Sequence, residues 1–550
     1  MTFVTLPPEL VVQIFSLIYP LEIARCRQIN RYILYIIESS TALQLRIQLA
    51  IDGLLLDPSF DDRKAPASGH ILEHVVARRQ AFHKMKPFSL RIIQQHSPER
   101  FSYERCDGLW AHAGDKVGRL FNSIHYDALV PFDKNSRNLS WSHQLGFPMR
   151  DLIFWGAGDL QVLLEVKDGW TTRTWHFRTL STNEIHPLAK SPTLELKRGE
   201  CKAWGYANFL LYEESFGVVL SESLWQDPTC MGEVIIWNWI KGKVVLPLTH
   251  ALDATLLSKD CLLTLIAQDG QIEVAIMCLS SGKTTYHLRL PQGIGHIGAH
   301  ILRHPCYNTS NRDFGPHAQT FAALCPSFPV TPDISVDIVL VEFQHTRLPP
   351  GYGSLLVLSK SHLLQLHRNQ LERTAAYDDI VNEFLSTPIA LEWESWGPKF
   401  SRWLPPGFRR ASGSCVFGSR ILAFAPRDLF EADPVDQAES IPSPIHIVLL
   451  DFNQRAVVQS KNDAAKDGYR ETAIISHTSP WSPTGCRSVI YDSDPGLRFR
   501  AIISEHPTKY KSVYLDGNAF ICRNLHSYDI FSFLSDPEGS SETGAGVEGF

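Results

Sequence analysis

The pattern of apolar and polar residues divides the chain into two regions with different periodicities. Up to about residue 50, apolar residues recur at the spacing of helices. From about residue 101, apolar or alternating runs of four to eight residues, such as GEVIIWNW and IHIVLLDF, are separated by turn residues. Such closely spaced runs are typical of β-strands. The pattern therefore predicts an α+β multidomain protein, in which a small helical module precedes a large, mainly-β domain.

Three helices are expected in the N-terminal module. The first begins near Pro8, because the first turn of a helix tolerates proline, and ends at Pro20. The second is expected from Leu21 to Glu38 and the third from Thr41 to Ile51. The first helix is apolar on most sides, and three helices of this size bury too little surface to be stable alone. We therefore expect either a partner chain or the large domain to cover them.

Changes in composition give the expected domain boundaries. The segment from Asp57 to His70 has the composition of a linker, and an amphipathic helix is expected from Ile71 to Met85. Another helix is expected from Tyr377 to Leu385, within an insertion, and the polar C-terminal tail is expected to be disordered. The resulting division is 1–54 for the helical module, 55–100 for the linker and amphipathic helix, 101–530 for the mainly-β domain and 531–550 for the tail.

A weak internal repeat indicates how the strands are arranged. EVIIWNWIKGKVVLPL, EVAIMCLSSGKTTYHL and IHIVLLDFNQRAVVQS each combine an apolar strand, a polar turn, a basic residue and a second strand. The basic residues Lys243 and Lys283 are 40 positions apart, and Arg455 follows after 172, close to four times 43. A period of about 40–45 residues with four strands per unit is typical of a β-propeller. Unrelated hairpins in a β-sandwich are the alternative.

Composition and charge exclude several classes of partner. The chain has 550 residues and a formal net charge of −6, and its basic residues are dispersed, so neither nucleic acid nor an anionic membrane is an expected partner. We find no signal peptide and no apolar run of the roughly 18 residues that a membrane span needs. Its 11 cysteines are scattered, which is typical of reduced thiols in the cytoplasm or nucleus.

The N-terminal segment resembles a known motif. It reads LPPEL from Leu6 to Leu10, IFSL from Ile14 to Leu17 and PLEIARCRQINR from Pro20 to Arg31. Residues in this order resemble an F-box, and LQLRIQLAIDGL, from Leu43 to Leu54, is similar to the continuation in many fungal F-box proteins. In that subgroup a β-rich region of several hundred residues follows. The resemblance covers about residues 5–54, and beyond them it is one of layout only.

The F-box resemblance implies a partner and a set of contact residues. F-box motifs bind the Skp adaptor of cullin-RING ubiquitin ligases, so the matching positions are expected to bind the adaptor or to pack beneath that contact. These positions are Leu6, Pro7, Leu10, Ile14, Phe15, Leu17, Ile18 and Leu21. One departure is that INRYI, from Ile29 to Ile33, replaces the V-C-x-x-W of many members, so the tryptophan is missing. A helical cap on the large domain, or another form of helix-groove recognition, is the alternative.

Motifs for cofactor and metal binding are weak. GIGHIG, at residues 293–298, satisfies G-x-G-x-x-G, but no amphipathic helix follows it, and a turn between strands is the better interpretation. The same region holds a group of metal-binding residue types: His296, His300, His304 and Cys306. The three histidines would share a face only on a helix, which the neighbouring glycines oppose. We therefore assign no cofactor and no metal ligands.

Three tryptophans in LEWESWGPKFSRW, namely Trp393, Trp396 and Trp403, either form an exposed aromatic surface or pack in the core of the large domain.

No pattern for nucleophilic or acid–base catalysis is found. The F-box resemblance therefore implies a non-enzymatic substrate-recognition subunit of an SCF (Skp–cullin–F-box) ubiquitin ligase, whose β-domain binds a target protein. The alternatives are a propeller-fold hydrolase or lyase with a decorative helical N-terminus, and an F-box scaffold that acts outside ubiquitin ligases.

Overall fold

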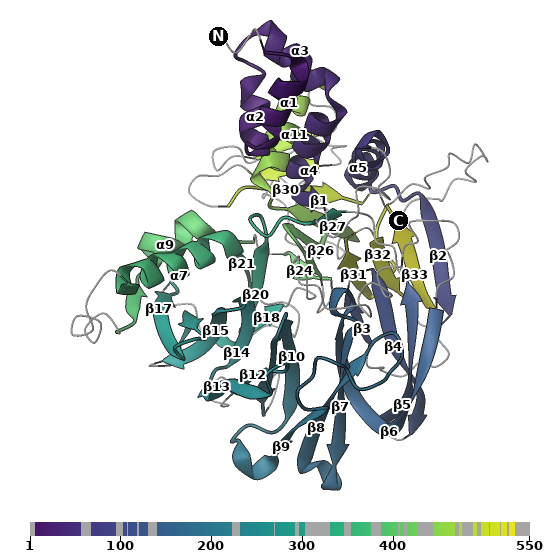
Figure 1. Cartoon of the computed structure of the whole chain (residues 1–550), viewed down its shortest axis with the longest axis vertical. Helices are drawn as coiled ribbons and strands as arrows, with labels where there is room; N and C mark the ends of the chain where they lie inside the picture. Colours follow the sequence, from purple (N-terminus) through teal and green to yellow (C-terminus); the bar gives the residue numbers. More distant parts are fainter. Residues whose placement is uncertain are drawn as a thin grey trace, which may run out of the picture.

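The computed structural model places helices at the N-terminus and a large body of β-sheets after them (Figure 1). It describes residues 6–56, 68–94, 103–129 (except 107 and 118–119), 140–222, 232–302 (except 269 and 292–295), 330–345, 354–375, 387–426 (except 405–406 and 412–414), 444–467, 472–475, 488–491 and 497–533 (except 505, 518 and 525–526). The residues expected to form a helix from 377 to 385, and residues 534–550 of the expected tail 531–550, lie outside this set. Residues 531–533 of that expected tail are described: a strand, Ser527–Ser532, extends into them, and Phe531 and Phe533 are buried.

The N-terminal module contains four helices where three were predicted. They are α1 (Pro8–Ser16), α2 (Pro20–Cys26), α3 (Arg31–Ser39) and α4 (Thr41–Asp52). The prediction of one helix from Leu21 to Glu38 was wrong, because the chain is extended at Asn30 and begins a new helix there. The Asn30 Oδ1 atom accepts a hydrogen bond of 2.8 Å from the Ile33 backbone N–H, which is the N-cap geometry that favours a helix start.

The described strands form six sheets of four or more strands, which follow one another around the β-body (Figure 1). The seven-stranded sheet β3–β9 divides at its long strand β6 into two four-stranded units, so seven units can be distinguished. Neighbours within each unit are antiparallel. In chain order the units are β3–β6, β6–β9, β10–β13, β14–β17, then β18 with β20, β21 and β23, then β24 with β26, β27 and β30, and finally β31–β33 with β2. This succession of antiparallel sheets is propeller-like, as the repeat predicted.

The strands of these units have the following bounds. In the first three units they are β3 Tyr103–Cys106, β4 Leu109–Val117, β5 Leu120–Ala128, β6 Ser140–Trp155, β7 Leu160–Lys167, β8 Thr172–Thr179, β9 Thr193–Lys197, β10 Tyr206–Tyr212, β11 Ser215–Ser221, β12 Gly232–Asn238 and β13 Lys243–His250. In the next two they are β14 Asp253–Ser258, β15 Cys261–Gln268, β16 Gln271–Cys278, β17 Lys283–Arg289, β18 His296–Leu302, β20 Ile338–His345, β21 Ser354–Ser359 and β23 Ser401–Trp403. In the last two they are β24 Arg409–Arg410, β26 Arg420–Pro426, β27 Ile445–Asp451, β30 Phe499–Ile503, β31 Ser512–Asp516, β32 Ala519–Arg523, β33 Ser527–Ser532 and β2 Ser89–Gln94.

Other elements extend or cover these units. The strands β1 (Leu54–Leu56) and β19 (Val330–Pro332) pair with each other, whereas β22 (Ile389–Leu391) pairs with β17. The strands β25 (Val416–Phe417), β28 (Thr472–Ile475) and β29 (Ser488–Tyr491) extend the unit of β26 and β27. The remaining helices are α5 (Ser68–His83), α7 (Lys360–Ala375), α9 (Trp393–Phe400) and α11 (Gln454–Asp467).

Two features close the ring of units. The long strand β6 pairs with β5 through its first half and with β7 through its second half, so it is shared by two units. The strand β2 pairs with β33, so a strand from the range 55–100 completes the sheet formed by the last strands of the chain (Figure 1). Trp110 of β4 then packs on Tyr514 and Tyr528 of that sheet, with ring centroids 5.9 Å and 4.8 Å away.

Apolar side chains fill the spaces between successive units. The inward residues of β7 and β8 pack against those of β11 and β12, and a second layer joins β10 and β12 to β15 and β16. The units of β14–β17 and β18–β21 share a third layer, which includes Trp396. The largest layer joins β20 and β21 to β26, β27 and β31–β33, and it also includes Phe82 of α5. The helix α5 is therefore part of the core of the β-body.

The predicted repeat is correct for two of its copies. EVIIWNWIKGKVVLPL forms most of the hairpin β12–β13, and EVAIMCLSSGKTTYHL forms most of β16–β17, each with its lysine at the start of the second strand. In the third copy β27 is followed by the helix α11, so the prediction of a second strand around Arg455 was wrong. Asn453 accounts for the helix start, because its Oδ1 atom accepts a 3.1 Å hydrogen bond from the Arg455 backbone N–H.

Among the described helices, none combines the length and the apolar composition that a membrane span requires.

Candidate interaction surface of the N-terminal helices

The four N-terminal helices have a small apolar core of their own. Val11 and Phe15 of α1 are buried against Ile23 of α2 and against side chains of α3 and α4. The other buried members of this core are Ile33, Ile36, Ile37, Leu43 and Ile47. Phe15, which was expected at or beneath the adaptor contact, is only 4% exposed and therefore lies beneath the surface.

The opposite side of α1 remains uncovered. Leu10 is 44% exposed, Ile14 is 39% exposed and Leu17 is 85% exposed. These residues are spaced by four and three positions, which places them on one side of a helix. Pro7 and Leu21 are also exposed, whereas Leu6 and Ile18 are half-buried against the small core. Five of the eight predicted contact residues are therefore accessible to another protein.

The end of α1 is fixed by an arginine from α4. The Arg46 guanidinium donates hydrogen bonds to the backbone oxygens of Phe15 (3.2 Å), Ser16 and Ile18 (3.1 Å). A cation is favourable beside the backbone carbonyls at the C-terminal end of a helix. Tyr32 holds the other end, because its hydroxyl donates a 2.7 Å hydrogen bond to the Leu6 backbone oxygen. The exposed side chains of α1 therefore project from a fixed backbone.

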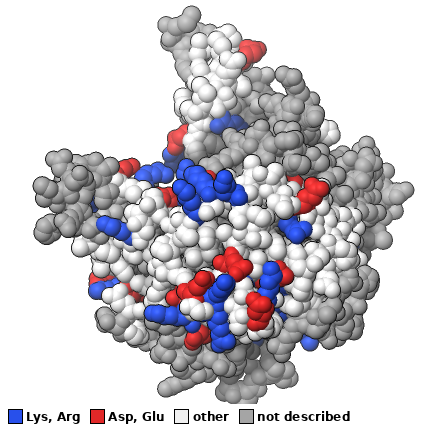
Figure 2. Space-filling view, turned by 60° about the horizontal axis from the view of Figure 1, so that its bottom comes forward, with Lys and Arg blue, Asp and Glu red and all other residues white. Residues whose placement is uncertain are grey.

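Three further large side chains of the module are exposed, and the sequence comparison with the F-box did not single them out. Tyr19 is 48% exposed, Ile29 is 66% exposed and Tyr35 is 69% exposed. Where the helical end comes into view at the top of Figure 2, its described surface carries few charged side chains. The face below it shows both signs of charge interspersed (Figure 2).

The module is attached to the β-body through the end of α4. Gly53 ends this helix in the left-handed conformation, with φ of +66°, and a Cβ atom there would lie 2.8 Å from Val336 Cγ2. The backbone then continues into β1, which pairs with β19. Asn453, at the start of α11, donates a 2.7 Å hydrogen bond to the Ile51 backbone oxygen, and Arg455 donates one of 3.1 Å to the Ala50 oxygen. Helix α11 therefore lies beside the module (Figure 1).

A buried ion-pair network lies beneath this attachment. Asp52, at the end of α4, pairs with Arg79 of α5 through contacts of 2.8 Å and 3.1 Å. Arg420 of β26 lies between two carboxylates, 3.9 Å from Asp52 and 3.6 Å from Asp451. Arg500 of β30 pairs with Asp451 at 3.3 Å. The network thus joins α4, α5 and three strands of the β-body, β26, β27 and β30, through charges that are largely removed from water.

The network changes the protonation of His83, at the end of α5. The Arg500 guanidinium donates to His83 Nε2 over 2.7 Å, so this nitrogen has no proton of its own. Burial lowers the pKa of His83 well below its usual value, and the nearby charges of Arg500, Arg79 and Arg420 lower it further. His83 is therefore held neutral as an acceptor for an arginine.

The residues that the sequence grouped for other chemistry are only partly brought together. His300, on β18, contacts Asp253 of β14 at 2.6 Å, which gives this histidine a carboxylate partner. The side chains of His296, His304 and Cys306 lie outside the described set. Trp396 is buried, and Trp393 and Trp403 pack against the same apolar layer, so these tryptophans are core residues.

No protein-family model matches the sequence, and no curated protein matches it. Among solved structures, an uncharacterized protein, lmo1340, from Listeria monocytogenes EGD-e is 7% identical, with a TM-score of 0.25, over 50% of this chain and 84% of that chain. The β-propeller domain of the Trilobed protease from Pyrococcus furiosus is 8% identical, with a TM-score of 0.26, over 71% of this chain and 97% of that chain. Structural similarities this distant do not indicate a function. The F-box resemblance rests on the residues of the N-terminal segment.

Proposed function

We propose that this protein is the substrate-recognition subunit of a cullin-type ubiquitin ligase, working in the cytoplasm or nucleus. In this proposal the N-terminal helices bind the Skp adaptor and, through it, cullin, while the β-body binds a target protein. The chain itself performs no chemistry, because ubiquitin transfer follows from holding the target near the catalytic subunits. The order of residues from Leu6 to Arg31 resembles an F-box, and this resemblance indicates the Skp adaptor as the partner.

One observation carries the proposal, namely the exposed apolar side of α1. Large aliphatic side chains that stand together on a surface mark sites of protein interaction. Leu10, Ile14 and Leu17 are presented at the spacing used by helices that enter apolar grooves. Phe15 fills the core below them, so the buried side of the helix is packed within the module.

The attachment through α4 supports a receptor role. A ligase subunit must hold its target at a defined distance from the adaptor. A loosely linked module would lose part of the rate gained by holding the target near the catalytic subunits. Here the hydrogen bonds from Asn453 and Arg455 and the pair Asp52–Arg79 fix the module on the rim of the β-body.

Co-elution of the full-length chain with purified Skp adaptor and cullin tests the proposal. The wild type is expected to elute as a complex, and Leu17→Glu is expected to abolish it, since a charge would then face an apolar groove. Val244→Glu is the matched control, because Val244 on β13 is 52% exposed and far from α1 in the chain. Failure of the wild type to bind, or equal loss with Val244→Glu, would overturn the proposal.

Point substitutions are preferable to deleting the first 50 residues. Such a deletion would remove the carbonyl of Ala50 that accepts from Arg455, and it would leave Arg79 facing an incomplete helix end. Leu17→Glu leaves these contacts in place. Proteins captured by both the wild type and Leu17→Glu are then candidates for the target, whereas those lost with Leu17→Glu belong to the ligase.

A further inference from the structure

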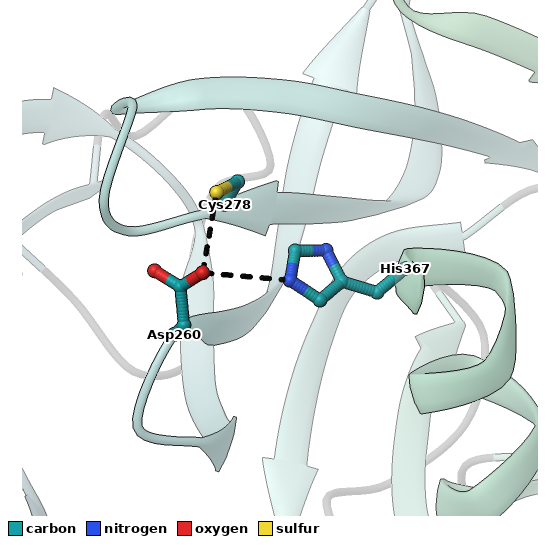
Figure 3. Close-up of side chains that lie close together, drawn as sticks. All are labelled: Asp260, Cys278 and His367. Atoms are coloured by element: carbon teal, nitrogen blue, oxygen red, sulfur yellow. Dashed lines mark hydrogen bonds and ion pairs between the residues drawn. The ribbon is translucent and has the colours of Figure 1, made fainter. Parts of the chain in front are cut away.

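Three side chains with metal-binding atoms meet between α7 and the unit of β14–β17 (Figure 3). Asp260 lies in the turn between β14 and β15, Cys278 is the last residue of β16, and His367 comes from α7. Their ligand atoms all lie within 4.8 Å of one another. Asp260 Oδ2 is 3.5 Å from Cys278 Sγ and 3.9 Å from His367 Nε2.

His367 is buried and is 6% exposed. Among the residues that the structure describes, neither of its ring nitrogens has a hydrogen-bond partner. An imidazole so placed forfeits its interactions with water, which costs free energy unless another ligand replaces them. Its ring nevertheless points toward Asp260 and Cys278 (Figure 3).

The Asp260 carboxylate is already oriented by its surroundings. The backbone N–H of Ser280 donates to Oδ1 over 2.7 Å, while the Ser280 hydroxyl lies 3.3 Å from Oδ2. The bond from the Ser280 backbone fixes the direction of the carboxylate. Oδ2 faces the Cys278 thiol and accepts from it and from the Ser280 hydroxyl, contacts that a bound cation would replace. Cys278 is a free thiol and is buried. The three groups therefore combine a fixed carboxylate, a buried thiol and an unsatisfied imidazole.

We propose that Asp260, Cys278 and His367 bind a zinc-class divalent cation that fastens α7 to the β-body. Ligands about 2.0–2.3 Å from a tetrahedral zinc ion lie about 3.3–3.8 Å apart, close to the two separations above. Thiolate, imidazole and carboxylate together suit zinc, whereas calcium and magnesium require oxygen ligands. On binding, the Cys278 thiol releases its proton to solvent and forms the sulfur–metal bond.

The fourth ligand would be a water molecule. The Asp260 side chain is 34% exposed, whereas Cys278 and His367 are buried, so solvent reaches the site from the side of the carboxylate. The ligands are separated by 18 and 89 positions in the chain, which is why no spacing motif pointed to them. A metal here would connect the helix that follows β21 to strands of the preceding unit.

Metal titration of the purified full-length protein, using zinc alone and cobalt as a spectroscopic substitute, tests the assignment. The wild type is expected to bind one equivalent, and the cobalt form to show thiolate-to-metal charge-transfer absorption. Substituting a residue that only hydrogen-bonds to a metal ligand typically weakens metal binding by roughly 10–100-fold. Cys278→Ser and His367→Gln remove ligands themselves, so they are expected to weaken zinc binding by more than this. The cobalt band should vanish with Cys278→Ser.

Two controls separate the site from other thiols and histidines. Cys201→Ser removes a half-buried thiol on another unit, and His362→Gln alters α7 five residues before His367, where His362 bonds to Ser359. Both are expected to retain one equivalent of zinc and the cobalt band. The assignment is overturned if the wild type binds no zinc, if Cys278→Ser and His367→Gln bind it as well as the wild type, or if the cobalt spectrum lacks a thiolate band.

Discussion

Replacing Asp52 with asparagine removes the charge that joins the helical module to α5. Asp52 is 5% exposed, and it accepts two hydrogen bonds from Arg79 while lying 3.9 Å from Arg420. Two charges about 4 Å apart interact by about 4 kcal/mol at an effective dielectric constant of about 20. Breaking a buried pair by removing one partner costs about 3–5 kcal/mol, because the other charge stays buried. We therefore expect Asp52→Asn to lower the free energy of unfolding by about 3–5 kcal/mol.

Urea denaturation followed by circular dichroism measures this loss. Glu22→Gln is the matched control, since Glu22 pairs with Arg25 at 2.6 Å on the surface of α2, where the two side chains are 50% and 66% exposed. A surface pair of this kind contributes about 0–1 kcal/mol. The reasoning is refuted if Asp52→Asn costs no more than Glu22→Gln. Limited proteolysis should also cut the variant sooner between the module and the β-body, because the attachment is weakened.

Three other predictions concern backbone strain and pH. Gly53→Ala should destabilise the fold by at least about 1–3 kcal/mol, measured by thermal unfolding, because φ is +66° and the new Cβ would press on Val336; an unchanged melting temperature would contradict this. Because burial lowers the pKa of His83 below its unfolded value, stability should fall as pH drops below about 6.5, by up to about 1.4 kcal/mol per pH unit, and His83→Gln should reduce that slope. Burial raises the pKa of Glu104 to about 7, so the free energy of unfolding decreases as pH rises from 4.5 to 7. Glu104→Gln should therefore stabilise the protein at pH 8 by at most about 3 kcal/mol and have no effect below pH 4.5. Equal effects at both pH values would refute this direction of pH dependence.

Periodicity alone predicts the larger part of the fold. Apolar runs and a 40-residue spacing are local properties, and they gave the division into helices and sheets and the hairpins that begin with Lys243 and Lys283. The break between α2 and α3 was missed, because a single N-cap at Asn30 outweighs an apolar pattern that continues across it. The helix α11 was missed for the same reason, with Asn453 at its start.

Contacts between residues far apart in the chain account for the features of the fold and of the candidate sites that sequence patterns did not predict. The range 55–100 has the composition of a linker and a helix, yet Ser89–Gln94 pairs with the last strand and Phe82 stacks on Phe533 with ring centroids 4.1 Å apart. No local signal marks such partners. The group of Asp260, Cys278 and His367 is likewise assembled only by the fold, whereas the side of α1 that carries Leu10 and Ile14 could be read from helical spacing.

Calorimetric titration of purified Skp adaptor into the full-length protein tests the central claim most directly. One-to-one binding with a negative heat-capacity change is expected, as apolar burial requires. Leu17→Glu should weaken binding by about 2–3 kcal/mol, or roughly 30–150-fold, and Val244→Glu should leave it unchanged. No heat of binding with the wild type, or the same affinity with Leu17→Glu, would contradict the claim that the uncovered side of α1 is the adaptor site.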